Sequence, residues 1–294
     1  MTDTASKTSG RRIVLGHTNY GKSDIRLVKV FRNPGRHEIK ELRVDVSQEG
    51  DFAAAHVEGD NTGLMATDTM RNTVYALARD RLTGSAEAFG VELVRHFLEA
   101  APRANRVRVS MVEHLWERIE AGGKPHEHSF VRAAGERTAE VVGDEEGNFS
   151  VEAGIDDLLV LKTTNSGWAG FLRDRFTTLP ETDDRILSTV VTSRWSYGGA
   201  TDLDFDRLWE GIRRRILETF TDHYSPSVQF TLHRMGRAVL ESFPEVERIH
   251  FSLPNRHHLL YDLERFGMEN PGEVFHADAE PYGLIEGTVE RSAS

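Results

Sequence analysis

Hydrophobic positions recur at two spacings along the chain, and each spacing occurs in both halves. Apolar and polar residues alternate over residues 25–32, 38–48, 106–116 and 248–253, the pattern of strands with one buried face. The first two segments flank Asn33-Pro34-Gly35, a sequence typical of a tight turn. They therefore predict a hairpin near the start of the chain.

Four longer segments carry apolar residues every three or four positions and predict helices. They are residues 68–80, 85–101, 205–221 and 227–243. We expect Thr67 and Asp68 to cap the first of these helices, because short polar side chains accept hydrogen bonds from free N–H groups. Pairs of helices thus alternate with antiparallel strands, and the predicted fold class is α+β.

One passage from helix to strand occurs twice. Residues 99–110 and 241–252 share Glu, Pro, Arg and Ser at matching positions, and each passes through a proline into a strand. A tandem duplication explains the match, and chance similarity of two such passages is the alternative. With a boundary in the acidic segment 143–149, we expect a disordered tail at residues 1–12 and domains at 13–145 and 146–294.

Composition narrows the classes of function. Of 294 residues, 38% are hydrophobic, and the net charge of −11 argues against nucleic acid or anionic membrane as the main partner. The absence of cysteine excludes disulfides, thiolate metal sites and cysteine nucleophiles. No apolar run approaches the roughly 18 residues of a membrane span. Because neither a secretory nor a peroxisomal signal is present, a cytoplasmic location is expected by default.

Three polar segments are candidates for chemistry, and each has a plainer alternative. Residues 162–176 mix aromatic and polar groups, which suits a planar polar ligand or a surface loop with one core Phe. Asn255 and His257 face one side of an extended chain, as a proton shuttle beside an amide or as a polar strand end. His126 and His128 have metal-ligand spacing, although such a pair in a loop is more often structural. No dinucleotide fingerprint, phosphate loop, zinc-helix motif or nucleophile elbow is present.

Eight short motifs occur in one order and together resemble the urate oxidase family over nearly the whole chain, from Tyr20 to Arg291. They are residues 19–22, 66–73, 124–130, 161–167, 171–174, 184–189, 226–229 and 252–257. The resemblance implies two tandem tunnelling-fold (T-fold) domains per chain, with antiparallel sheets and helices on one face. It also implies a homotetramer whose strands form a β-barrel tunnel, active sites shared between subunits, and no metal or organic cofactor.

The resemblance further implies a role for each matching residue. Lys22, Thr67 and His257 correspond to a catalytic proton relay whose members would meet across a domain or subunit boundary. Asn255 corresponds to the amide that holds oxygen, and later water, above the ligand. The implied substrate-binding residues are Arg185 and Gln229 as a clamp, Thr67, the backbone amides of Asp68 and Val228, and Trp168 as the stacking ring, for which Phe171 is the alternative.

The chemistry of these groups fits the implied reaction. A guanidinium fork matches an anionic edge in bidentate fashion, and a Gln amide offers a donor and an acceptor to the opposite edge. Urate would be oxidised by O2 and water to 5-hydroxyisourate and hydrogen peroxide in purine degradation, because its deprotonated ring can itself reduce oxygen. The alternatives are a non-catalytic purine-binding T-fold protein and a T-fold enzyme acting on a pterin or another purine. A zinc-dependent enzyme of that kind would need a His or Cys cluster.

Overall fold

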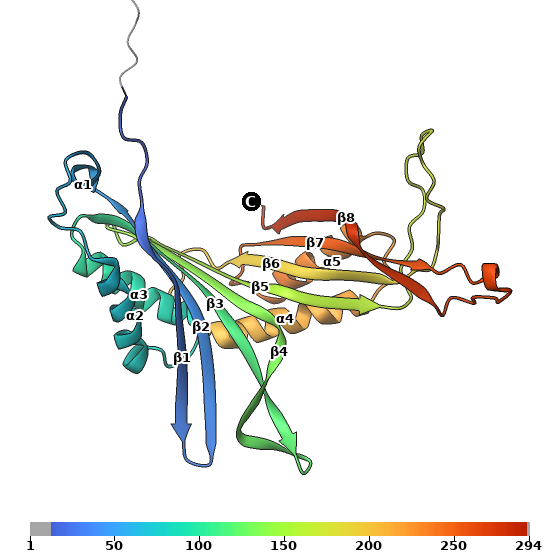
Figure 1. The fold of residues 1–294 in the computed structure, drawn as a ribbon, viewed down its shortest axis with the longest axis horizontal. Helices are drawn as coiled ribbons and strands as arrows, with labels where there is room; N and C mark the ends of the chain where they lie inside the picture. The colour runs from blue at the N-terminus through green and yellow to red at the C-terminus, as the bar shows by residue number, and fades with distance from the viewer. Residues whose placement is uncertain (1–12, 293–294) are drawn as a thin grey trace, which may run out of the picture.

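The computed structural model describes residues 13–292 and contains one eight-stranded antiparallel sheet (Figure 1). The strands lie in sequence order from β1 to β8. Their bounds are β1 Tyr20–Asn33, β2 Arg36–Gly50, β3 Ala104–Ala121, β4 Lys124–Asp144, β5 Phe149–Lys162, β6 Leu187–Ser196, β7 Arg248–Leu260 and β8 Phe275–Glu290. The tail predicted at residues 1–12 lies outside the described residues.

The order of elements repeats once along the chain. Two strands, two helices and two strands make up each half, with α2 (Thr67–Arg81) and α3 (Ala86–Ala100) in the first half. The second half contains α4 (Phe205–Thr221) and α5 (Val228–Ser242), while α1 (Ala53–Val57) and the 3-10 helix η1 (Glu264–Phe266) are short additions. The α+β class with two repeats is therefore confirmed. The domain division at residues 145 and 146 stays a prediction, and it falls in the turn between β4 and β5.

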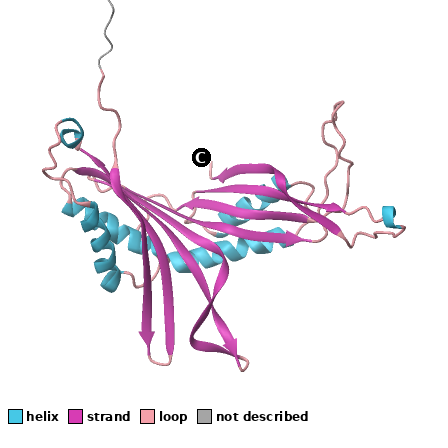
Figure 2. Ribbon diagram, viewed as in Figure 1, coloured by secondary structure: helices cyan, strands magenta, loops and turns pink. Residues whose placement is uncertain are grey.

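The helices cover one face of the sheet, where the core lies (Figures 1 and 2). In α3, Phe89, Leu93 and Phe97 recur every four residues and are buried against β3 and β4. Each such side chain contributes about 1.5–3 kcal/mol on burial. Gly90 permits this contact, because a Cβ there would lie 2.6 Å from Cε of Met111. The apolar spacing in the sequence thus determines which helix face meets the sheet.

Short polar side chains cap three of the four long helices, α3, α4 and α5, but not α2. Ser85 Oγ accepts from the N–H of Ala88 at α3, and Ser227 Oγ accepts from the N–H of Phe230 at α5. The predicted cap of α2 by Thr67 and Asp68 is wrong. Ala66 is the N-cap residue there and makes no side-chain cap, so Thr67 is the first helical residue. The Thr67 hydroxyl is consequently not used as the helix cap.

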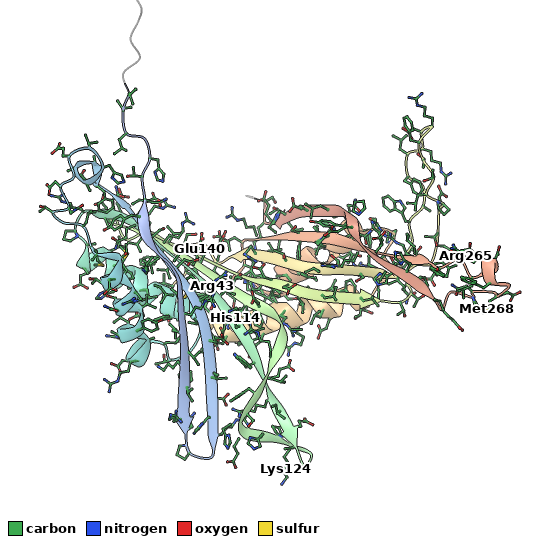
Figure 3. The ribbon with its side chains drawn as sticks, viewed as in Figure 1. Arg43, His114, Lys124, Glu140, Arg265 and Met268 are labelled. Atoms are coloured by element: carbon green, nitrogen blue, oxygen red, sulfur yellow. The ribbon has the colours of Figure 1, made fainter. Side chains whose placement is uncertain are left out.

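The opposite face of the sheet is free of helices and polar. Arg43 on β2 and Glu140 on β4 both lie on it, as Figure 3 shows. The two hairpins of the first half extend beyond the helices, with tips at Pro34-Gly35 and near Lys124 (Figures 1 and 3). Gly35 has a φ of 72°, a left-handed conformation that glycine adopts without strain. Within the described residues, no helix is long and apolar enough to cross a membrane.

Candidate active site

Two loops and the start of α5 are tied together at one end of the second half. Ser166 forms an isolated bridge with Ser225, and the N–H of Gly167 donates to the carbonyl of Ser225 at 2.9 Å. The N–H of Arg185 donates to the carbonyl of Ser166 at 2.7 Å. These backbone contacts place the segment before β6 beside the segment before α5. The two sequence motifs that contain Arg185 and Gln229 are therefore neighbours in space.

Arg185 is a half-buried cation at this place. Its Nε is buried and has no hydrogen-bond partner within the described residues, and burial lowers the pKa of its guanidinium. The hydroxyls of Ser166 and Thr189 are also buried and unpartnered. A buried polar group without a partner costs about 1–3 kcal/mol, so such groups are rare unless a ligand or water completes them. Three of them on adjoining segments indicate a binding site for a polar ligand.

The start of α5 provides further polar groups. The first N–H groups of a helix have no partners within it, and Val228 and Gln229 are the first two residues of α5. Val228 is 4% exposed, whereas the side chain of Gln229 is exposed and free to reach a ligand. A backbone donor and a side-chain amide are thus presented together.

A hydrogen-bonded network joins the end of α4 to the start of α5. His223 Nδ1 lies 2.7 Å from the carbonyl oxygen of Thr219, and Nε2 lies 2.9 Å from Oγ1 of Thr231. The Thr231 hydroxyl is 2.7 Å from Ser225 Oγ, which donates to the carbonyl of Ser227 at 3.0 Å. Burial lowers the pKa of His223 and favours its neutral form, which can donate through Nδ1 and accept through Nε2.

Trp168 and Phe171 stack on each other. Their ring centroids are 5.6 Å apart and the planes differ by 10°. Two backbone hydrogen bonds with Thr182, of 2.7 and 3.0 Å, hold Trp168 in place. The guanidinium of Arg173 lies over the Phe171 ring at 5.3 Å. Phe171 thus contacts both Trp168 and Arg173, and which of the two rings stacks on a ligand stays a prediction.

Asn255 and His257 lie on β7 next to the same region. Asn255 is the register partner of Thr189 on β6. A register shift between Asn255 and His257 interrupts the simple alternation expected from the sequence, yet Asn255 Nδ2 remains 3.5 Å from His257 Nδ1. Both side chains are partly buried. The structure therefore keeps this amide and imidazole together.

Lys22, Thr67 and Asp68 gather at one end of the first half. Lys22 precedes a bulge in β1, and Thr67 is the first residue of α2. The N–H of Met65 donates to the hydroxyl of Tyr20 at 3.0 Å, which ties the segment entering α2 to the start of β1. Lys22 and Thr67 each lie two residues beyond this contact. Asp68 is exposed, and its carboxylate pairs with Arg71 at 2.6 Å.

The two groups of residues are far apart within one chain. Lys22 on β1 is aligned across the sheet with Val46 on β2, Val109 on β3, Val141 on β4 and Val151 on β5. The neighbouring row of aligned residues reaches β7 at Arg248. Asn255 lies seven residues further along β7, or about 23 Å at 3.3 Å per residue. The six strand spacings from β1 to β7 add roughly 29 Å across the sheet. Lys22 and His257 therefore do not meet within the chain.

The histidines of the third motif lie on β4 near a hairpin tip. The rings of His126 and His128 are 4.5 Å apart, and that of His37 is 6.2 Å from His128. Among residues 13–292, no group of three His, Cys, Asp or Glu residues is arranged to hold a metal ion. The alternative that these histidines bind a metal has no support in this arrangement.

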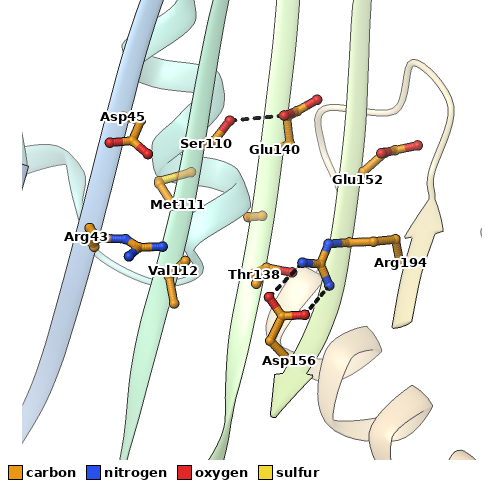
Figure 4. A pocket seen from close by; sticks show the side chains of 11 residues that line it. Arg43, Asp45, Ser110, Met111, Val112, Thr138, Glu140, Glu152, Asp156 and Arg194 are labelled. Atoms are coloured by element: carbon orange, nitrogen blue, oxygen red, sulfur yellow. Dashed lines mark hydrogen bonds and ion pairs between the residues drawn. The ribbon is translucent and has the colours of Figure 1, made fainter. Parts of the chain in front are cut away.

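A polar cavity of about 280 Å³ lies on the helix-free face of the sheet (Figure 4). Arg194 pairs with Asp156 there at 2.7 Å, and Ser110 donates to Glu140 at 3.0 Å. These charges are largely satisfied by one another. The cavity is thus lined mainly by paired charged groups, although the Thr138 hydroxyl in its lining is buried without a partner.

Sequence reasoning did not single out Ser166 and Thr189. Both lie inside the quoted motifs, but a hydroxyl without a partner becomes visible only when the surrounding chain is placed. Motif membership was the one signal in the sequence that could have drawn attention to them.

Comparison with known proteins gives matches over the whole chain. A family model described as Uricase matches residues 18–142 and 151–286. The uricase of Arthrobacter globiformis is 46% identical over 297 residues, covering 100% of this chain and 95% of the relative. That of Dictyostelium discoideum is 40% identical, covering 94% and 96%. The crystal structure of the Arthrobacter globiformis uricase matches with a TM-score of 0.91 at 45% identity, covering 97% of each chain. A Bacillus sp. TB-90 urate oxidase structure has a TM-score of 0.80 at 22% identity, covering 93% of this chain and 100% of the other, and supports the fold alone.

Proposed function

The chain belongs to the uricase family and oxidises urate, and we propose that it does so in a site assembled from two subunits. The first-half group of one subunit, Lys22 with Thr67 and Asp68, would meet the second-half group of another. Its fold is the two-repeat T-fold of this family, and the comparisons favour neither a pterin-acting nor a non-catalytic alternative.

The observation that carries the proposed binding site is the buried, unpartnered Nε of Arg185. The guanidinium would hold the anionic edge of urate, and the amide of Gln229 would hold the opposite edge with a donor and an acceptor. The N–H of Val228 and that of Asp68 would add backbone donors. Trp168 would stack on the purine with the face that Phe171 does not cover.

The proposed chemistry requires removal of a proton from bound urate and a place for oxygen. Lys22 would act as the base through the hydroxyl of Thr67, with His257 completing the relay. Asn255 would hold O2, and later the water that adds to the ring, above the ligand plane. Urate, O2 and water then give 5-hydroxyisourate and hydrogen peroxide, with two electrons passing from the purine to oxygen. We propose no metal or organic cofactor for these steps.

The assembly we propose is a homotetramer whose sheets form a tunnel. The polar, helix-free face of the sheet would line that tunnel, which agrees with the ion pairs Arg194–Asp156 and Arg108–Glu140. Within residues 13–292, the sheet edges at β1 and β8 have no pairing strand, and they would join to other subunits. The cytoplasmic location expected from the sequence stays a prediction.

The test uses protein treated with a chelator and dialysed. Loss of the near-ultraviolet absorbance of urate is followed together with oxygen uptake and peroxide release. Equal amounts of urate lost, oxygen consumed and peroxide formed would support the proposed reaction. Turnover that disappears with the metal and returns on its addition would contradict the proposed cofactor-free chemistry.

A further inference from the structure

The two halves place equivalent residues at the starts of α3 and α5. Glu87 is the second residue of α3 after the cap Ser85, just as Gln229 is the second residue of α5 after the cap Ser227. Glu113 on β3 lies the same distance along the sequence from Glu87 as Asn255 on β7 lies from Gln229. Glu87 and Glu113 are therefore the first-half counterparts of two residues in the proposed urate site.

The place beside Glu87 and Glu113, called the first-half position below, is occupied by a side chain of the same protein. Arg137 on β4 donates from Nε to Oε1 of Glu87 at 3.3 Å and from Nη2 to Oε2 at 2.6 Å, a bidentate pair. Its Nη1 donates to Oδ1 of Asp206 at 2.5 Å, and the ring of Trp209 lies 5.3 Å from its central carbon. Glu87 is fully buried and Arg137 is 4% exposed. A planar guanidinium is thus held by a carboxylate fork and an aromatic face, as a bound ligand would be.

This position lies where the two halves of the chain meet. Glu87 belongs to α3 of the first half, whereas Asp206 is the second residue of α4 in the second half, as Asp68 is of α2. The start of α3 therefore faces the start of α4 within one chain. The proposed urate site pairs the start of α5 with the start of α2 of another subunit in the same way.

The charge of the first-half position is opposite to that of the urate site. Glu87, Glu113 and Asp206 surround Arg137, and Oε2 of Glu113 is buried with no hydrogen-bond partner, 3.9 Å from Nη1 of Arg137. Lys40 neutralises the other side of Glu113 at 2.8 Å. An anionic purine would be repelled here, and a planar cation is favoured.

We propose that the junction between the two halves is a second ligand position, selective for planar guanidinium-type cations and closed by Arg137 acting as an intramolecular ligand. The chain then has one open site per subunit because the other is occupied from within. Removal of the Arg137 side chain opens a buried site for a small guanidinium compound.

The test measures the melting temperature of Arg137→Ala with and without ethylguanidinium at millimolar concentration. At about ten times the dissociation constant, binding should raise the melting temperature by about 2 °C. Ethylammonium at the same concentration serves as the charge control, and the wild type, whose position is filled, should not respond. The double variant Glu87→Gln, Arg137→Ala retains the cavity but lacks the carboxylate fork, so it should not respond either.

Equal stabilisation of the double variant, or of Arg137→Ala by ethylammonium, would overturn the proposal, as would no response of Arg137→Ala. If Arg137→Ala does not accumulate in folded form, it is refolded from urea with each cation. Recovery of folded protein with ethylguanidinium alone supports the proposal, and recovery independent of the cation, or none, contradicts it. The readout is folding, so failure of the proposed urate site would leave it unaffected.

Discussion

Lys22 on β1 and His257 on β7 belong to one continuous sheet, but five strands lie between β1 and β7. The two residues also lie near opposite ends of the sheet along the strand direction. Tyr20, two residues before Lys22, accepts a hydrogen bond from Met65, two residues before Thr67, and His257 lies near Asn255. A proton relay between them requires a second subunit. Under the proposed function, the position of these two residues makes the assembly part of the chemistry.

Lys22→Met should abolish proton removal while ligand binding survives. Lys22 is the proposed base of the first-half group, in which the Asp68 carboxylate is paired with Arg71, and loss of one acid–base residue typically lowers turnover by about 10²–10⁴-fold. Turnover and the affinity for a non-reacting purine analogue are measured on the same preparation. Lys29→Met on the same strand is the control. Because Lys29 donates to three carbonyls near the end of α2, its loss should lower stability and leave turnover per folded chain intact. Near-normal turnover of Lys22→Met would contradict the assigned role.

Arg185→Ala should fail mainly in binding. A hydrogen bond to a charged group contributes about 1.5–3 kcal/mol, so the affinity for a purine analogue should fall by roughly 10–100-fold. Arg185→Lys should not restore it, because an ammonium lacks the guanidinium fork. Titration calorimetry measures both, with Arg175→Ala as the control, since Arg175 lies over the exposed Phe176 ring. Unchanged affinity in Arg185→Ala would remove this residue from the site.

Phe171→Leu should weaken urate binding more than turnover, because in the proposed site Trp168 stacks on the purine and Phe171 stacks on Trp168. A stacked aromatic pair contributes about 0.5–1.5 kcal/mol, which predicts a rise in KM of about 2–10-fold with little change in kcat. Trp168→Phe should retain stacking, and Trp168→Ala should lose it. Phe176→Leu, with a ring that is 71% exposed, is the control. If Phe171→Leu leaves KM unchanged while Trp168→Ala raises it, the supporting role of Phe171 is wrong.

His223 should make stability depend on pH on the acidic side of neutrality. Because its pKa in the folded chain is lowered from 6.5, the unfolded chain binds the proton more tightly. The contribution of His223 is therefore complete above pH 6.5 and is lost as the pH falls below that value. The free energy of unfolding should fall less between pH 7.5 and 5.5 in His223→Gln than in the wild type. His17→Gln, at an exposed position, should behave as the wild type does.

The four long helices could be predicted to within about two residues because apolar spacing alone defines a buried face, whereas the short α1 and η1 bury no residue and were not predicted. The cap of α2 could not, since Thr67 and Asp68 have the right side chains but the chain turns into the helix one residue earlier, at Ala66. The motifs located Arg185 and Asn255, but the unpartnered state of Arg185 Nε depends on contacts between segments far apart in sequence. Likewise, the separation of Lys22 from His257 follows from register across six strand pairs, which no local pattern encodes.

The most direct test of a site shared between subunits mixes two variants that fail for different reasons. Lys22→Met and Arg185→Ala are unfolded together in equal amounts and refolded. Urate oxidation is then compared with that of wild type treated alike, at a urate concentration well below the wild-type KM, where weakened binding lowers the rate in proportion. In a mixed pair, one of the two sites would receive both intact groups, so random pairing predicts recovery of about one quarter of wild-type activity. Each variant refolded alone should show at most about a tenth of wild-type activity under these conditions. No recovery in the mixture, with mixed oligomers demonstrated by mass spectrometry, would contradict the shared site and return all the assigned residues to one chain.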